Sequence, residues 1–134
     1  MAGKIGATAQ GGGTGVGRFV RRLNWKPWSV PGFLTADARG YVGVVSVVEL
    51  VWVLTDCYAL RKDELCEVLT SLLRTKEIVV AHADTVWRAL RLFKEGKADF
   101  ADCLIERFAN EAGCDHTATF DRDAARHCGM RLVG

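Results

Sequence analysis

The chain has 134 residues, of which 49% are hydrophobic and 25% are charged. This length fits one compact domain with a single core and excludes a large multidomain enzyme. The apolar content excludes a chain that is disordered throughout, and only two prolines interrupt the pattern.

The formal net charge of +2 hides an asymmetry along the chain. Residues 1–40 hold six Lys or Arg and a single acid, Asp37, which leaves a net charge of −3 for the remaining residues. Half of the fourteen glycines lie within residues 1–17. We therefore expect a glycine-rich basic head over residues 1–32, mobile or poorly packed, followed by a folded domain over residues 33–134. Trp25 and Trp28 are expected to anchor the head on the domain surface, with stacking on nucleic-acid bases as the alternative.

The cysteines and the apolar runs indicate the compartment. Five cysteines are an odd number, no CxxC pair is present, and residues 1–17 lack an apolar leader segment, so we expect reduced thiols in a cytoplasmic protein. The most apolar run, residues 42–54, is shorter than the ~20 residues that cross a bilayer, so no membrane span is expected. Four residues have zinc-ligand side chains but match no standard zinc spacing: Cys114, His116, His127 and Cys128. Small buried hydrophobic side chains are the better interpretation of the cysteines.

From residue 41 onward, strand patterns and helix patterns alternate. The β-branched run 41–45 predicts a buried strand, after which Ser46 is expected to begin a helix with a capping box to Glu49. The other predicted helices cover residues 62–74, 82–95, 99 to just before 113, and 121–128. Gly96 is expected to end one of them in a left-handed conformation. The other predicted strands cover residues 77–80, 116–120 and 130–133. This alternation predicts an α/β fold with a mainly parallel sheet and helices on both faces.

Three of the predicted helices begin with acidic residues. Glu49 follows the strand at 41–45, Asp99 and Asp102 lie on one side of a helix at three-residue spacing, and Asp121 follows the strand at 116–120. The carboxyl ends of neighbouring parallel strands share one edge, so these carboxylates are expected to converge there. Clustered carboxylates repel one another, and Mg²⁺ or Mn²⁺ relieves that repulsion.

The sequence neighbours of Glu49 strengthen this interpretation, because they are all apolar and a buried carboxylate needs a partner. The ordinary structural alternative is that these acids are helix caps: Glu49 with Ser46, and Asp99 and Asp121 as N-caps. Spacing alone leaves both interpretations open.

Three sequence blocks carry a family resemblance. Residues 45–54 (VSVVELVWVL), 98–105 (ADFADCLI) and 119–125 (TFDRDAA) resemble the corresponding blocks of PIN-domain ribonucleases, in the same order and at similar separations. The resemblance covers about residues 33–133 and is greatest to the VapC-type toxins of bacterial toxin–antitoxin pairs.

The resemblance implies a three-layer α/β/α sandwich with a mainly parallel central sheet, and a metal-dependent endoribonuclease that hydrolyses RNA phosphodiester bonds. It implies that Glu49, Asp102 and Asp121 are the catalytic acids and that these three, with Asp99, bind Mg²⁺ or Mn²⁺. It also implies a cognate antitoxin that holds the enzyme in check. The apolar helices around residues 49 and 65–73 could pair with a second copy or with the antitoxin, and a homodimer is expected.

One motif departs from the family pattern. The family opens with a strand ending in an Asp-Thr-Asn-Val type motif whose Asp is the first metal ligand, whereas the nearest match here is Gly13 to Val16, which contains no acid. Two alternatives follow. One is a catalytically impaired PIN-fold protein that retains antitoxin binding. The other is a metal-independent nucleic-acid-binding module that uses the basic side chains of the head, Arg18, Arg21, Arg22 and Lys26.

Overall fold

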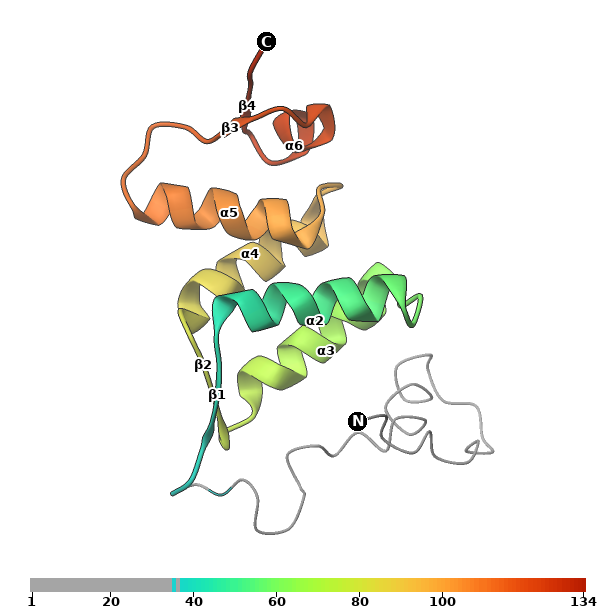
Figure 1. Ribbon diagram of the computed structural model, residues 1–134, viewed down its shortest axis with the longest axis vertical. Helices are drawn as coiled ribbons and strands as arrows, with labels where there is room; N and C mark the ends of the chain where they lie inside the picture. Colours follow the sequence, from blue (N-terminus) through green and yellow to red (C-terminus); the bar gives the residue numbers. More distant parts are fainter. Residues whose placement is uncertain (1–34, 36) are drawn as a thin grey trace.

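A computed structural model describes residue 35 and residues 37–134 of the chain (Figure 1). The predicted head over residues 1–32 lies outside the described residues. The expectations for its mobility, for the anchoring role of Trp25 and Trp28, and for the altered motif at Gly13 to Val16 lie there too.

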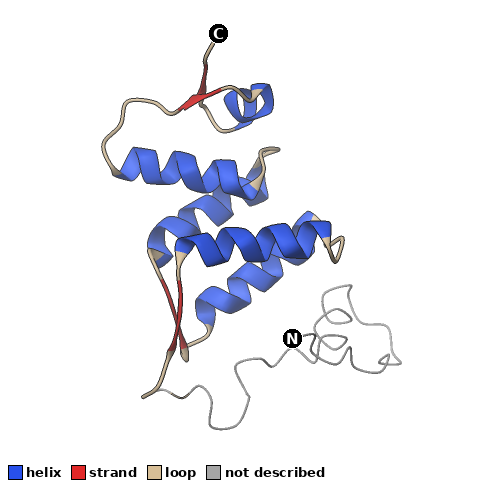
Figure 2. Cartoon of the chain, viewed as in Figure 1, coloured by secondary structure: helices blue, strands red, loops and turns tan. Residues whose placement is uncertain are grey.

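Along the described chain, two helices follow the first strand, two follow the second and one follows the third. Figure 2 colours the helices blue and the strands red. The strands are β1 (Gly40–Val42), β2 (Ile78–Val80), β3 (Ala118–Thr119) and β4 (Arg131–Leu132). The helices are α2 (Val44–Asp56), α3 (Lys62–Arg74), α4 (Ala83–Glu95), α5 (Phe100–Glu111) and α6 (Arg122–His127). The predicted α/β class with parallel strands is confirmed, and the boundaries predicted for α3 agree with the structure.

The described strands form two parallel pairs. β1 pairs with β2, with Gly40 opposite Ile78, and β3 pairs with β4, with Ala118 opposite Arg131. No hydrogen-bonded ladder joins the two pairs within the described chain. In Figure 1, the β1–β2 pair and the β3–β4 pair lie on opposite sides of α5, and α6 accompanies the second pair. The strands predicted at 116–120 and 130–133 are present, but each is only two residues long.

Helix packing forms the centre of the core. Phe100, at the start of α5, is 2% exposed and meets the Phe93 ring of α4 edge-on, with 5.8 Å between ring centroids. The buried Thr85 hydroxyl of α4 donates a hydrogen bond to the Glu111 carboxylate at the end of α5. These contacts join α4 and α5 near both of their ends, which fixes the position of the N-terminus of α5.

The predicted start of α2 is wrong. The helix begins at Val44 with Gly43 as its N-cap, and no side chain caps it, so there is no capping box between Ser46 and Glu49. The first helical hydrogen bond already runs from the Val47 N–H to the Gly43 carbonyl, at 3.1 Å. Val44 and Val45 prefer strands, but that preference is only a few tenths of a kcal/mol per residue. Burial of Val47 and Leu54 on the inner face of the helix outweighs it. A reciprocal bond of the capping-box kind occurs instead at α3, where the Arg61 N–H donates to the Glu64 carboxylate at 2.8 Å.

The left-handed conformation predicted for Gly96 is also wrong. Gly96 is extended, with φ −104° and ψ −169°, and its N–H donates to the Leu92 carbonyl at 2.9 Å. A Cβ at this position would lie 3.1 Å from the Leu92 carbonyl oxygen. The Lys62 ammonium donates to the Gly96 carbonyl oxygen from the other side. Glycine is therefore favoured here by close approach of the backbone and not by a positive φ.

Among the described helices, none combines the length and the apolar character needed to cross a membrane. All five cysteines are free, and Cys66, Cys103 and Cys128 are buried, as expected of small hydrophobic side chains, whereas Cys57 and Cys114 are exposed.

Candidate acidic site

Asp99 caps the N-terminus of α5. Its Oδ1 accepts a hydrogen bond from the Asp102 N–H at 2.8 Å, which satisfies one of the free amides of the first turn. The prediction that Asp99 opens this helix is therefore confirmed. The cap also places the Asp99 and Asp102 side chains together at the same end of α5.

Asp121 has the same role at α6. Its Oδ1 accepts hydrogen bonds from the N–H groups of Asp123 at 2.7 Å and Ala124 at 3.3 Å. Its own N–H donates to the Thr119 hydroxyl at 3.0 Å, which fixes the turn from β3 into the helix. The position of Asp121 is thus determined by β3 on one side and by the helix start on the other.

The charges of Asp99 and Asp121 act on the Asp102 carboxyl. Burial raises the pKa of the partly buried Asp102 carboxyl above its ordinary value, and the negative charges of Asp99 and Asp121 raise it further, as does a side-chain hydrogen bond with Asp99. Asp121 is 19 residues away in the sequence, so the fold brings it to the N-terminus of α5. Asp99 and Asp121 therefore lie near enough to Asp102 for their charges to act on its carboxyl.

Glu49 differs from the prediction in two respects. It lies in the second turn of α2, since no acid occupies the first turn of that helix, and its side chain is exposed. The argument from its apolar sequence neighbours was wrong because Glu49 and its neighbour Trp52 both lie on the exposed side of the helix, whereas the buried Val47 lies on another side. Its charge is not among those acting on Asp102.

The donor chemistry of the aspartates fits a hard divalent cation, because carboxylate oxygens are the ligands that Mg²⁺ and Mn²⁺ prefer. The arrangement is not a closed site. Among residue 35 and residues 37–134, no group of three or more His, Cys, Asp or Glu side chains lies close enough to hold one ion. One oxygen of Asp99 and one of Asp121 are also engaged in helix caps.

Two thiols lie next to the acids. The Sγ atoms of Cys103 and Cys128 are 3.9 Å apart, and both side chains are buried. Burial, together with the neighbouring Cys128 and the nearby aspartates, raises the pKa of Cys103 to about 12. Sequence spacing gave no sign of this contact. The other cysteine and histidines of the weak zinc pattern, Cys114, His116 and His127, are exposed while Cys128 is buried, so the pattern is not assembled into a metal site in the described part of the chain.

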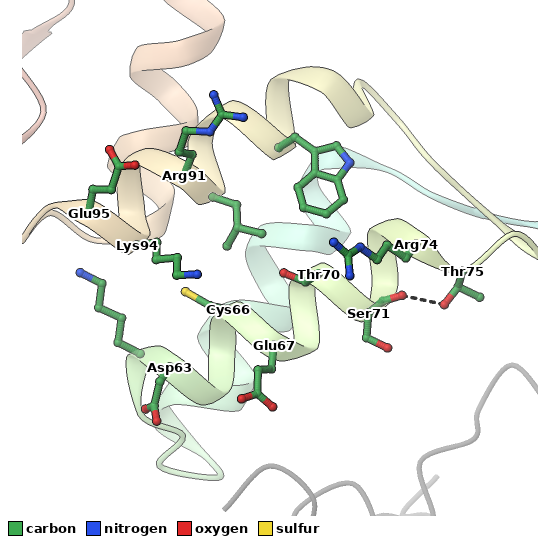
Figure 3. Close-up of a pocket in the computed structure, with 13 residues that line it drawn as sticks. Asp63, Cys66, Glu67, Thr70, Ser71, Arg74, Thr75, Arg91, Lys94 and Glu95 are labelled. Atoms are coloured by element: carbon green, nitrogen blue, oxygen red, sulfur yellow. Dashed lines mark hydrogen bonds between the residues drawn. The ribbon is translucent and has the colours of Figure 1, made fainter. Parts of the chain in front are cut away.

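A separate groove of about 1470 Å³ runs between α3 and α4 (Figure 3). Lysines and arginines alternate with acids along it, and the Arg74 guanidinium lies 5.9 Å from the centre of the Trp87 ring. Figure 3 shows the charged side chains coming from both helices: Lys94 of α4 reaches toward Cys66 of α3, whereas Asp63 and Glu67 point away from α4. None of the four predicted acids lines this groove. Its mixed charge favours neither an anionic nor a cationic ligand.

Comparison with known proteins supplies the family. Neither a curated protein nor a solved structure matches the sequence. The family model described as the PIN domain matches residues 29–130, a span that holds the three aspartates, Glu49 and all the described elements except β4. Since that match covers most of the sequence and the described part has the expected α/β fold, the chain belongs to the PIN domain family, whose members are in general nucleases.

Proposed function

We propose that this protein is a metal-dependent endoribonuclease and the toxin of a toxin–antitoxin pair. The observation that supports the proposal is the effect of Asp99 and Asp121 on Asp102, whose carboxyl pKa is raised by burial and by both charges. Carboxylates that repel one another at the surface of a nuclease fold favour a divalent cation as their common partner. Mg²⁺ or Mn²⁺ is the cofactor that this proposal requires.

In this proposal Asp102 and Asp121 are the central acids, Asp99 is a further ligand, and Glu49 completes the set from α2. A bound cation would neutralise phosphate charge and lower the pKa of the attacking water. Asp99 also orients the site, because its cap fixes the first turn of α5. Thr119 holds the Asp121 backbone at the end of β3.

The proposed partners are an RNA substrate, a cognate antitoxin that covers the acids with a basic side chain, and a second copy of the chain. Arginine is suited to the antitoxin role, because its guanidinium pairs with carboxylates through charge-assisted hydrogen bonds. The cytoplasm, where thiols stay reduced, is the proposed compartment and agrees with five free cysteines.

An RNA cleavage assay tests the enzyme proposal. Purified protein without antitoxin would be incubated with structured RNA in Mg²⁺, in Mn²⁺ and in EDTA, beside Asp102→Asn, Asp121→Asn and Glu49→Gln. Removal of a central acid is expected to slow metal-dependent cleavage by about a hundredfold or more, because it misplaces the reacting groups. Asp115→Asn is the matched control, since Asp115 is an exposed carboxylate between α5 and β3. Cleavage that survives EDTA, or survives all three substitutions, would contradict the proposal.

The second candidate is a catalytically impaired PIN-fold protein that retains antitoxin binding. Two observations favour it: Gly13 to Val16 contain no acid, and the described residues form no closed group of three metal-ligating side chains. A well-folded protein that binds Mn²⁺ weakly and cleaves none of the RNA tested would support it. RNA binding that persists in EDTA and weakens steeply with salt would instead support a nucleic-acid-binding module that uses the basic head.

A further inference from the structure

Helix α2 has two distinct faces. Val47 and Leu54 are 0% and 2% exposed and face the core. Val45, Glu49, Trp52 and Asp56 recur at helical spacing on the other face, and all four are exposed, Val45 at 76% and Trp52 at 56%. We call these four residues the outer stripe of α2. In Figures 1 and 2, no described element lies in front of this helix.

The outer stripe alternates apolar and acidic side chains. α2 contains no Lys, Arg or His, so the two carboxylates have no cation on their own helix. No ion pair between the described residues involves Glu49 or Asp56. A single exposed apolar residue is ordinary on a protein surface, but a tryptophan between two acids that form no ion pair with a described residue favours a partner that is both aromatic and basic.

Residues 18–28 of the same chain have that composition. Their sequence, RFVRRLNWKPW, contains four basic side chains, three aromatic rings and no acid. A second copy of α2 fits the outer stripe less well, because a symmetric pairing would bring the two acidic faces together. Charge complementarity therefore selects the head of the chain over a second copy.

Chain length permits this contact. Thr35 and Ala38 close a turn through two backbone hydrogen bonds of 3.2 Å, so six residues, 29–34, lie between position 28 and that turn, and a chain of this length spans up to about 20 Å. Only Gly43 separates β1 from α2, and a 13-residue helix is about 20 Å long. A tether of this length allows residues 18–28 to reach the outer stripe, at an effective concentration on the order of millimolar.

We propose that residues 18–28 dock on the outer stripe of α2 in the same molecule, with their aromatic side chains covering Val45 and Trp52 and their cations against Glu49 and Asp56. The docked head covers Glu49. One consequence rests on the proposed ribonuclease function: the docked segment shields Glu49 from the RNA substrate and thereby lowers the cleavage rate.

Limited proteolysis and hydrogen exchange of the full-length chain test the docking without any nuclease assay. Trypsin cleaves after Arg21 and Arg22, and a docked segment resists it. The variant Trp52→Ala/Asp56→Lys changes the outer stripe but leaves Glu49 intact. We expect it to be cleaved at these sites about tenfold faster than the wild type and to lose amide protection over residues 18–28. Ile105→Ala/Glu67→Lys is the matched control, because it removes one exposed apolar residue and reverses one exposed acid on other helices.

A variant of the head, Trp25→Ser/Trp28→Ser, leaves α2 unchanged and is expected to give the same release. Circular dichroism of every variant confirms the fold. Equal cleavage rates in the wild type and both docking variants would overturn the proposal. Protection that disappears when the protein is diluted about a hundredfold would also overturn it, because a contact within one molecule is independent of concentration. None of these measurements depends on RNA cleavage, so the docking proposal and the ribonuclease proposal can fail separately.

Discussion

Replacement of Asp99 separates its role as a helix cap from its role as a charge. The Asp99 Oδ1 accepts the Asp102 N–H at 2.8 Å, and no other cap of α5 is formed by a side chain. Asp99→Ala removes that acceptor and should lower the free energy of unfolding by about 1 kcal/mol. For a domain of this size, such a loss lowers Tm by about 4 to 8 °C. Asp99→Asn keeps the acceptor and removes the charge, so its Tm should stay close to that of the wild type.

Urea denaturation followed by circular dichroism measures both variants, with Asp115→Ala as an exposed control outside any helix. The charge effect is measured in the same proteins by titrating Asp102. Both variants remove the repulsion from Asp99 and should therefore lower the pKa of the Asp102 carboxyl toward its ordinary value. If Asp99→Asn is destabilised as much as Asp99→Ala, the capping argument is refuted. An unchanged Asp102 pKa in both variants would refute the electrostatic one.

Three further predictions follow from burial and charge. The raised pKa of Asp102 means that its ionisation opposes folding, so the wild type should lose stability relative to Asp102→Asn as the pH rises through the folded-state pKa. Water screens this partly exposed group, so the loss in the free energy of unfolding from acid to neutral pH, measured by urea denaturation, should be small, and an opposite sign would contradict it. Phe100→Ala leaves a cavity at a 2% exposed position and should destabilise by about 3 to 5 kcal/mol, as measured by thermal melting; a loss below ~1 kcal/mol would show that the core closes around it. A thiol reagent should modify two cysteines rapidly in the native protein and the other three only on unfolding, because only Cys57 and Cys114 are exposed; rapid reaction of the buried Cys103 would contradict its high pKa.

The sequence predicted the helices well where their apolar residues recur on one side. The bounds of α3 were predicted correctly, and Asp99 was correctly predicted to open α5, because a capping side chain is a local signal. The start of α2 was mispredicted because Val44 and Val45 favour strands in isolation, while burial of Val47 and Leu54 decides their conformation. Burial is a property of the whole fold, so the local pattern could not reveal it.

The same distinction applies to the candidate site. The electrostatic effect of Asp121 on Asp102 agrees with the rule that polar side chains gather where parallel strands lead into helices, whereas a metal site built from these acids stays a prediction. The exposure of Glu49 could not be predicted, because the apolar residues around it in the sequence do not show which side of α2 faces the core. The contact between Cys103 and Cys128 depends on how α6 packs on α5, which no spacing rule gives.

The position of Asp121 relative to Asp102 depends on the packing of the short unit made of β3, α6 and β4. This unit is held to the rest of the molecule largely by three small or flexible side chains that are buried, Ala124, Cys128 and Met130. Asp121 belongs to this unit, whereas Asp102 belongs to α5, which packs on α4. Any local opening that frees the unit, such as amide exchange detects, must also separate the two carboxylates. The pKa of the Asp102 carboxyl therefore reports whether the unit of β3, α6 and β4 is packed against α5, because it should fall when Asp121 moves away.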